Sequence, residues 1–237
     1  MSFQYQIRNA LIQITGYFIY KKKDLPIGIN LATDLKNIFK QEAKTVFDIG
    51  ANTGQTALNY YNEFPTANIY SFEPVTKTFE QLKRNTVTKS RIQNYKIAFG
   101  NKKEEVEINL FDDANSQLNS IKISNPKTDA IKEKIQVETI DNFIKEKKIE
   151  EIDLLKIDTE GFEIEVLSGA QKLLESNNVK AILCETALSP QNKRNTQLNE
   201  LITFLNQYNY YFVSLYETNI NYYKEGLAYS NALFIRK

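Results

Sequence analysis

Short, largely apolar runs alternate along this chain with longer segments in which apolar residues recur at helical spacing. The short runs predict strands at residues 45–50, 67–74, 92–100, 104–112, 152–158, 179–186, 210–217 and 231–237. The longer segments predict helices at residues 31–43, 54–64, 76–88, 161–178 and 196–209, and a further helix ends the segment 137–149. Strands that alternate with helices favour a mostly parallel sheet with helices on both faces, and the last two strands are expected to pair antiparallel at its edge.

The first residues predict a separate helix. Ile7, Leu11, Ile14 and Phe18 recur at helical spacing, and three lysines follow them. The apolar part of this segment is about half the length that a membrane-spanning helix needs, and no signal-peptide pattern accompanies it. We interpret residues 1–43 as an N-terminal helical segment that docks on the domain, forms a homodimer or caps the substrate, with a membrane-surface helix as the alternative.

Composition limits the chemistry available to the chain. The 237 residues carry a formal net charge of +1, which gives no bulk attraction to nucleic acid or to an anionic membrane. The single cysteine, Cys184, excludes an internal disulfide and fits a cytoplasmic protein. Because the chain has no histidine, proton transfer would fall to Asp, Glu, Lys, Tyr or water, and a metal would be a hard cation held by oxygen ligands.

Acidic residues recur where the predicted strands end. Asp48, Glu73, Asp158 and Glu185 each stand at or near the carboxyl end of a different strand. In a parallel sheet these ends meet at one edge, where ligands bind near the point at which strand order reverses. The pattern therefore predicts a binding site at this edge.

The loop after the first strand narrows the choice of ligand. Gly50 and Gly54 allow the backbone to approach a ligand closely, but the third glycine of a dinucleotide-binding loop is missing and Asp48 would repel a diphosphate. Glu73 ends the second strand, where an acid accepts hydrogen bonds from ribose hydroxyls. This combination favours S-adenosylmethionine over NAD.

The motifs VFDIGANTG, SFEP, AFG and IDLLKIDTEGFEIEVLSGA resemble those of the FkbM family of S-adenosylmethionine-dependent methyltransferases. The resemblance covers roughly residues 44–236, and makes residues 44–237 a methyltransferase domain. It implies the Rossmann-like class I methyltransferase fold, an α/β fold with a seven-stranded sheet whose last strand is antiparallel. It also implies methylation of hydroxyl groups, commonly on sugars or polyketide-like natural products.

The resemblance also assigns cofactor contacts. Gly50, Asn52 and Gly54, with Thr53 between them and Asp48 nearby, would line the methionine end of the cofactor. Glu73 would hold the ribose. The remaining assignments border the adenine or lie in a loop near cofactor and substrate: Ala98, Phe99, Asp113, Asn115 and Ser116.

A neutral hydroxyl nucleophile needs a base to take its proton or a metal to hold its oxygen. Asp158 and Glu160 are the candidate bases, although Glu160 would equally suit the first turn of the next helix. Lys156 lies in phase with Asp158 and would either orient the substrate or form a structural ion pair. Asp158 and Glu185 would hold Mg²⁺ if the enzyme uses one.

Two other functions remain open at this point. One is an NAD-dependent oxidoreductase, and the other is a non-catalytic nucleotide-binding protein of the same fold. The sequence leaves undetermined the small-molecule or glycan acceptor, the choice among O-, N- and C-methylation, the need for a metal and the oligomeric state.

Overall fold

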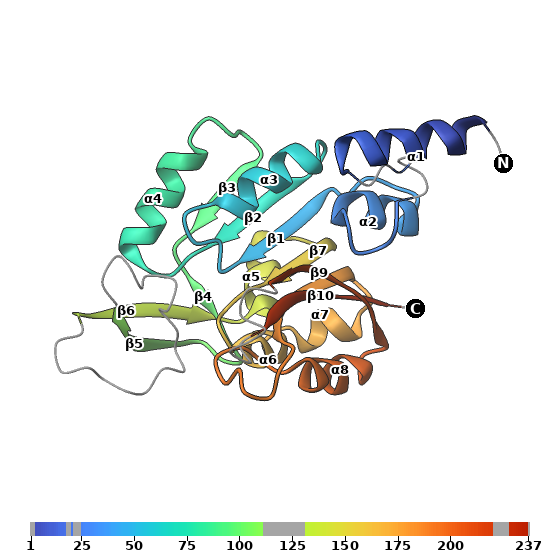
Figure 1. The fold of residues 1–237 in the computed structure, drawn as a ribbon. Coiled ribbons are helices and arrows are strands. Elements are labelled where there is room, and N and C mark those ends of the chain that lie inside the picture. Colours follow the sequence, from blue (N-terminus) through green and yellow to red (C-terminus); the bar gives the residue numbers. More distant parts are fainter. Residues whose placement is uncertain (1–2, 18–19, 21–24, 111–130, 220–227, 237) are drawn as a thin grey trace.

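A computed structural model describes residues 3–17, 20, 25–110, 131–219 and 228–236 of the chain (Figure 1). The predictions for Asp113, Asn115, Ser116 and Phe18 lie outside these residues. In the described part of the chain, no helix is both long enough and apolar enough to cross a lipid bilayer.

The central element is a seven-stranded sheet in the order β3-β2-β1-β7-β8-β10-β9. Its strands are β1 (Thr45–Ile49), β2 (Asn68–Phe72), β3 (Ile92–Tyr95), β7 (Ile152–Ile157), β8 (Val179–Ala187), β9 (Tyr210–Asn219) and β10 (Tyr229–Arg236). Neighbouring strands from β3 to β8 are parallel, whereas β10 runs antiparallel to both β8 and β9. This sheet confirms the predicted fold class. Strand order reverses between β1 and β7, which is where a ligand is expected to bind in a sheet of this kind.

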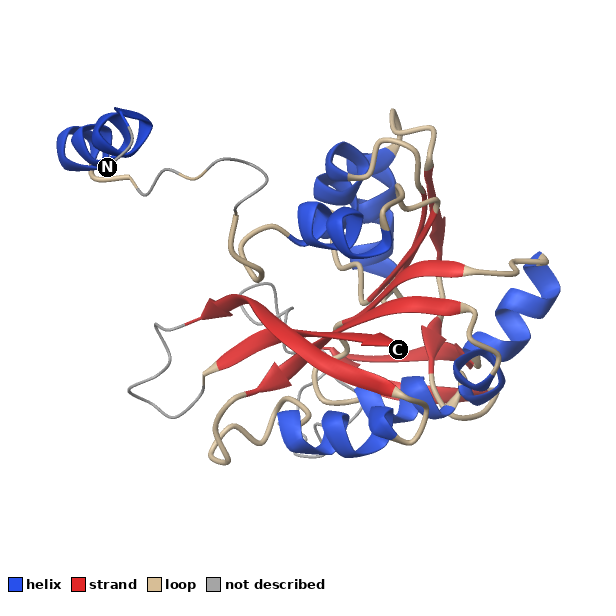
Figure 2. Ribbon diagram, turned by 90° about the vertical axis from the view of Figure 1, so that its right-hand side faces the viewer, coloured by secondary structure: helices blue, strands red, loops and turns tan. Residues whose placement is uncertain are grey.

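Helices cover both faces of the sheet (Figures 1 and 2). They are α2 (Leu31–Phe39), α3 (Gln55–Glu63), α4 (Thr76–Thr86), α5 (Ile140–Lys147), α6 (Glu163–Ser168), α7 (Gln171–Glu175) and α8 (Leu198–Asn206). One apolar core forms where α2 and α3 pack on alternate side chains of the central strands, and a larger core forms where α5 to α8 cover the opposite face. Alternate residues of β1 therefore point into different cores: Val46 towards α3 and Phe47 towards α5.

The predicted strand at residues 92–100 is two strands in different sheets. β3 ends at Tyr95, and β4 (Ala98–Phe99) leaves the main sheet to pair in parallel with β6 (Ile131–Glu138). β6 also pairs antiparallel with β5 (Glu104–Leu110), which forms a three-stranded sheet beside the large one (Figure 1). β5 was predicted; β6 was not, although Ile135 and Val137 alternate with polar residues and are both buried.

The predicted long helix at residues 161–178 is also divided, into α6 and α7. A Cβ built on Gly169 would lie 2.0 Å from the carbonyl oxygen of Gly100, so the chain at this point passes too close to the β4 loop for a side chain. The carbonyl oxygen of Gly169 accepts a hydrogen bond from the N–H of Asp141 at 3.0 Å. Tertiary contacts therefore interrupt a helix that the periodicity alone predicts to be continuous.

The N-terminal helix α1 (Phe3–Thr15) forms as predicted but stands apart from the rest of the molecule (Figure 2). Its apolar residues Ile7, Leu11 and Ile14 are 45%, 42% and 80% exposed. On α2, Leu35 is buried as predicted, whereas Ile38 is 38% exposed and does not join the core face. The division into residues 1–43 and 44–237 stays a prediction.

Candidate active site

The loop between β1 and α3 forms a tight turn against the end of β7. Gly50 and Gly54 have φ values of 78° and 96°, and Asn52 has a φ of 49°, all in the left-handed region. A Cβ on Gly50 would lie 1.8 Å from the carbonyl oxygen of Asp158. Glycine at this position therefore lets the β1 and β7 loops pass in direct backbone contact, which places Asp158 beside the predicted cofactor loop.

A cleft of about 780 Å³, part of it open to solvent, lies on one side of these two loops. Its walls are largely apolar and come from β2, β4, the β5–β6 hairpin and the β7–α6 loop; among them are Phe72, Val75, Ala98, Phe99, Ile108, Ile135 and Phe162. Gly50, Asn52 and Glu73 lie along the polar side of the cleft. The cleft therefore combines an apolar wall with a carboxylate and a glycine turn.

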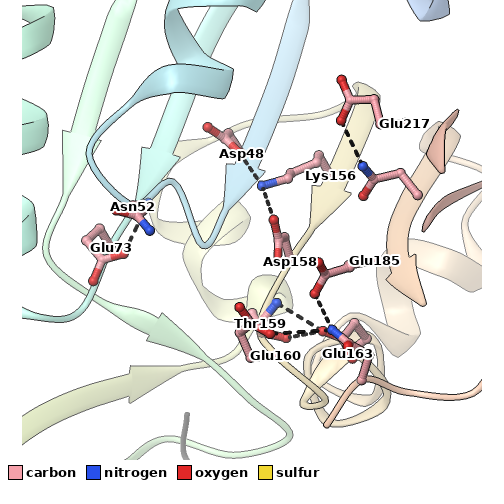
Figure 3. A network of polar contacts seen from close by, with 12 residues as sticks. Asp48, Asn52, Glu73, Lys156, Asp158, Thr159, Glu160, Glu163, Glu185 and Glu217 are labelled. Atoms are coloured by element: carbon pink, nitrogen blue, oxygen red, sulfur yellow. Dashed lines mark hydrogen bonds and ion pairs between the residues drawn. The ribbon is translucent and has the colours of Figure 1, made fainter. Parts of the chain in front are cut away.

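Glu73 is held rigidly at the edge of this cleft. One carboxylate oxygen accepts a hydrogen bond from the N–H of Asn52 at 3.2 Å (Figure 3). The other accepts a hydrogen bond from the N–H of Val75 at 2.9 Å. Burial raises the pKa of Glu73 to about 7, although these two hydrogen bonds favour the charged form. Because each carboxylate oxygen has two lone pairs, both oxygens remain able to accept another hydrogen bond from a ligand.

A second polar group lies under the turn, where Lys156 bridges two aspartates (Figure 3). Its Nζ is 3.1 Å from Asp48 Oδ1 and 3.2 Å from Asp158 Oδ2. Burial alone would lower the pKa of Lys156, but Asp158 and Asp48 raise it above its usual value. Burial raises the pKa of Asp48, and Lys156 opposes that shift. Lys156 is therefore a buried cation that contacts Asp158 from the interior of the protein.

Asp158 also belongs to a group of acids at the ends of β7 and β8. One oxygen from each of Asp158, Glu160 and Glu185 lies within 4.8 Å of the others. Burial raises the pKa of Glu160 to about 7 and that of Glu185 well above its usual range, and neighbouring acids add to both shifts. Arg194 forms an ion pair with Glu160, and the Asn195 amide donates hydrogen bonds to Glu160 and Glu185. These partners, together with protons retained by the acids, reduce the repulsion within the group.

The model for the methyltransferase FkbM domain matches residues 48–212 of the chain. These residues include the loop between β1 and α3, the loop between β7 and α6, and the acidic group formed by Asp158, Glu160 and Glu185. The chain belongs to the FkbM methyltransferase family. The resemblance seen in the motifs is thereby confirmed, and the matched residues coincide with the part of the sheet that carries the cleft.

Three curated proteins are related to this family member over part of its length. "Methyltransferase 1" of Beauveria bassiana is 25% identical over 52% of the chain, and the match spans 57% of that protein's own length. "2-O-methyltransferase NoeI" of Sinorhizobium fredii is 25% identical over 62% of the chain and 65% of its own length. "Methyltransferase sdnD" of Sordaria araneosa is 25% identical over 69% of the chain and 72% of its own length.

Solved structures with a similar fold include two complexes with S-adenosylhomocysteine. M. capricolum TrmK has a TM-score of 0.49 at 12% identity, covering 86% of this chain and 68% of that one. The 1,6-didemethyltoxoflavin-N1-methyltransferase of Burkholderia thailandensis has a TM-score of 0.49 at 9% identity, covering 87% and 76%.

The predicted site residues of this FkbM protein fall into separate places. Gly50, Asn52, Glu73, Ala98, Phe99 and Glu160 line the cleft. Gly54 caps α3, and the carbonyl oxygen of Thr53 accepts a hydrogen bond from Asn85. Lys156 and Asp158 line a different cavity, described below; beside them, Asp48 is fully buried and Glu185 is largely buried. The predicted roles of all these residues stay predictions.

Sequence reasoning missed a buried acid that braces the loop between β7 and α6. One oxygen of Glu163 accepts hydrogen bonds from the N–H groups of Thr159 and Gly161 at 2.9 and 3.1 Å, and the other accepts one from the Thr196 hydroxyl. Glu163 has no exposed surface. Glu163 belongs to the motif KIDTEGFE, but only the structure shows that its carboxylate fixes the backbone of the loop that carries Asp158 and Glu160.

We expect Glu163→Ala to lower the free energy of unfolding by about 2 kcal/mol, because buried N–H groups lose their acceptor. Turnover should fall about tenfold as the loop that carries Asp158 loosens. Chemical denaturation and a turnover assay measure both effects. Glu163→Gln keeps an acceptor oxygen of the same shape and should lose less than half as much stability. Equal losses in the two variants would contradict the bracing role.

Proposed function

We propose that this protein transfers a methyl group from S-adenosylmethionine to a hydroxyl of a small-molecule or glycan acceptor. The observation that carries the proposal is Glu73, a buried carboxylate fixed beside a glycine turn at the edge of an apolar cleft. Support for the oxygen as acceptor atom comes from a curated relative named as a 2-O-methyltransferase.

The residues of the cleft fit the parts of this cofactor. Glu73 would accept hydrogen bonds from the two ribose hydroxyls, and the apolar wall that includes Phe99 and Ile108 would enclose the adenine. The turn at Gly50 would leave room for the methionine portion. When bound, the cofactor supplies an electrophilic methyl group on a positively charged sulfur.

Asp158 is the proposed base for the acceptor hydroxyl. It is partly exposed, with 32% of its side chain accessible, and Lys156 contacts one of its oxygens from the protein interior. A hydroxyl that binds Asp158 would lose its proton to the carboxylate as its oxygen attacks the methyl carbon. Lys156 would position Asp158 for this step through their contact of 3.2 Å.

A metal would act at the same place. Carboxylate oxygens are the ligands that Mg²⁺ takes, and Asp158 and Glu185 would hold it, where it would lower the pKa of the bound hydroxyl. Each of the three acids already has a partner: Asp158 is paired with Lys156, Glu160 is paired with Arg194, and Glu185 accepts a hydrogen bond from Asn195. Magnesium, a homodimer through α1 and a cytoplasmic location stay predictions.

Calorimetric titration with S-adenosylhomocysteine, with NAD as the control ligand, tests the proposal. We expect S-adenosylhomocysteine to bind with a dissociation constant on the order of micromolar, and NAD to show no heat of binding. Binding of NAD instead would favour the oxidoreductase alternative. Binding of S-adenosylhomocysteine without turnover on any hydroxylated acceptor would favour the non-catalytic alternative.

A further inference from the structure

A second cavity lies on the α3 face of the sheet, separate from the cleft assigned to the cofactor. The space between its walls is about 710 Å³, part of it open to solvent. Its walls come from the segment before α2, from one side of α3, and from β7, β8, β9 and β10. Its polar lining includes Asn59, Glu63, Lys156, Asp158, Glu217 and Asn231.

The two cavities meet at the β7–α6 loop. Asp158 lines the second cavity, while the next two residues, Thr159 and Glu160, line the cofactor cleft. At this junction the backbone of Gly50 lies directly against Asp158, whose carbonyl oxygen leaves no space for a Cβ on the glycine. A group bound in the second cavity with its reactive atom at Asp158 would therefore face the methionine end of the proposed cofactor site.

Acidic side chains outnumber basic ones among the described residues that line the second cavity. Glu63, Glu217 and Asp158 contribute carboxylates, whereas Lys156 is the one cationic side chain among the described lining residues. Lys156 is already paired with Asp48 and Asp158. Glu63 and Glu217 stand at the exposed side of the cavity, where their partners are the neutral side chains of Asn30 and Asn231. Burial and the nearby Glu217 raise the pKa of Glu63, which indicates that these two acids disfavour each other's charge.

Asn231 adds an unmet hydrogen bond on the same wall. Its Nδ2 donates to Glu217 at 3.0 Å, whereas its Oδ1 is buried and has no donor among the described residues. A buried acceptor without a donor costs free energy that a ligand's N–H or O–H group would recover. Asn231 stands opposite Glu185 in the sheet, and it lines the same cavity as Asp158.

We infer that the second cavity binds the acceptor, and that the acceptor is an amine-bearing polyol such as an amino sugar. A hydroxyl of the acceptor contacts Asp158, and its protonated amine lies between Glu63 and Glu217. Asn231 Oδ1 accepts a hydrogen bond from an N–H or O–H group of the acceptor. In the transfer step the hydroxyl oxygen forms a bond to the methyl carbon, the bond from that carbon to sulfur breaks, and Asp158 takes the hydroxyl proton. This inference rests on the proposed function and adds the acceptor class to it.

Saturation-transfer NMR with D-glucosamine as the probe tests the inference on protein saturated with S-adenosylhomocysteine. We expect signals from glucosamine and signals at least about fivefold weaker from N-acetyl-D-glucosamine, which lacks the positive charge. Asn59→Trp fills the cavity and should abolish the glucosamine signals, whereas Asn62→Trp, on an exposed part of the same helix outside the cavity, should preserve them. Glu217→Gln should weaken them, and Glu175→Gln, at the end of α7, should not.

Three outcomes would overturn the inference: glucosamine giving no signals, N-acetylglucosamine giving equal ones, or signals that persist in Asn59→Trp. Calorimetry with S-adenosylhomocysteine on the same samples separates this result from failure of the proposed function. If S-adenosylhomocysteine binds and glucosamine does not, only the acceptor assignment is wrong. If S-adenosylhomocysteine itself does not bind, the proposed function fails.

Discussion

The Asp158→Asn variant should bind S-adenosylhomocysteine as tightly as the wild type and lose about 1,000-fold in turnover, within the range that general bases contribute. The amide keeps the size of the side chain and can still contact Lys156 through its oxygen, so the fold and the cofactor cleft should be preserved. What it loses is the ability to accept the hydroxyl proton. Turnover is measured as S-adenosylhomocysteine released with an acceptor found by screening sugars, and binding by calorimetry.

Two controls show which chemistry Asp158 supplies. Glu185→Gln replaces a neighbouring acid of the same group without removing the proposed base, and should lower turnover much less. EDTA should leave turnover of the wild type unchanged if Asp158 acts as a base alone. Loss of turnover in EDTA that is restored by Mg²⁺ would assign Asp158 and Glu185 to a metal instead, and full activity of Asp158→Asn would remove it from both roles.

The Glu73→Ala variant should weaken binding of S-adenosylhomocysteine about 100-fold, because hydrogen bonds to a charged group contribute about 1.5–3 kcal/mol each. The variant also leaves the N–H groups of Asn52 and Val75 without their acceptor, which should loosen the turn that lines the cleft. Calorimetric titration measures the loss. Glu80→Ala removes an exposed acid from the neighbouring helix α4 and should leave the affinity unchanged. Unchanged affinity in Glu73→Ala would mean that the cofactor's ribose lies elsewhere.

The pH dependence of binding gives an independent check on Glu73. Its pKa is raised to about 7 in the free protein, so its carboxyl is increasingly protonated below pH 7. Ribose hydroxyls donate to the ionised form, so binding should favour that form. Affinity for S-adenosylhomocysteine should therefore be full above about pH 8 and fall as the pH drops through 7. In Glu73→Gln, which carries no titrating group at this position, the dependence should be flat over the same range.

The order of apolar and polar residues along the chain was sufficient to predict most of the fold. Alternation of apolar runs with helical segments predicted the parallel strands, their covering helices and the antiparallel pair at the end, because burial of apolar side chains follows the period of each element. The same alternation placed Asp48, Glu73, Asp158 and Glu185 at strand ends. The motifs around Gly50 and Glu163 were sufficient to indicate the family.

Contacts between distant segments decided the rest. The close passage of Gly169 over Gly100 breaks a helix whose periodicity is continuous, and β4 joins β6 rather than extending β3. Neither the break in the helix nor the pairing of β4 can be predicted from the neighbouring sequence, because each depends on a contact with a segment that is distant along the chain. The second cavity is of the same kind, since Asn30, Glu63, Lys156 and Asn231 come from four separate segments. The sequence by itself determined the fold class, the family and the edge of the sheet where ligands are expected to bind. Only the tertiary structure decided which acids lie near one another, which are paired with Lys156, and which face the second cavity, because each of these depends on contacts between distant segments.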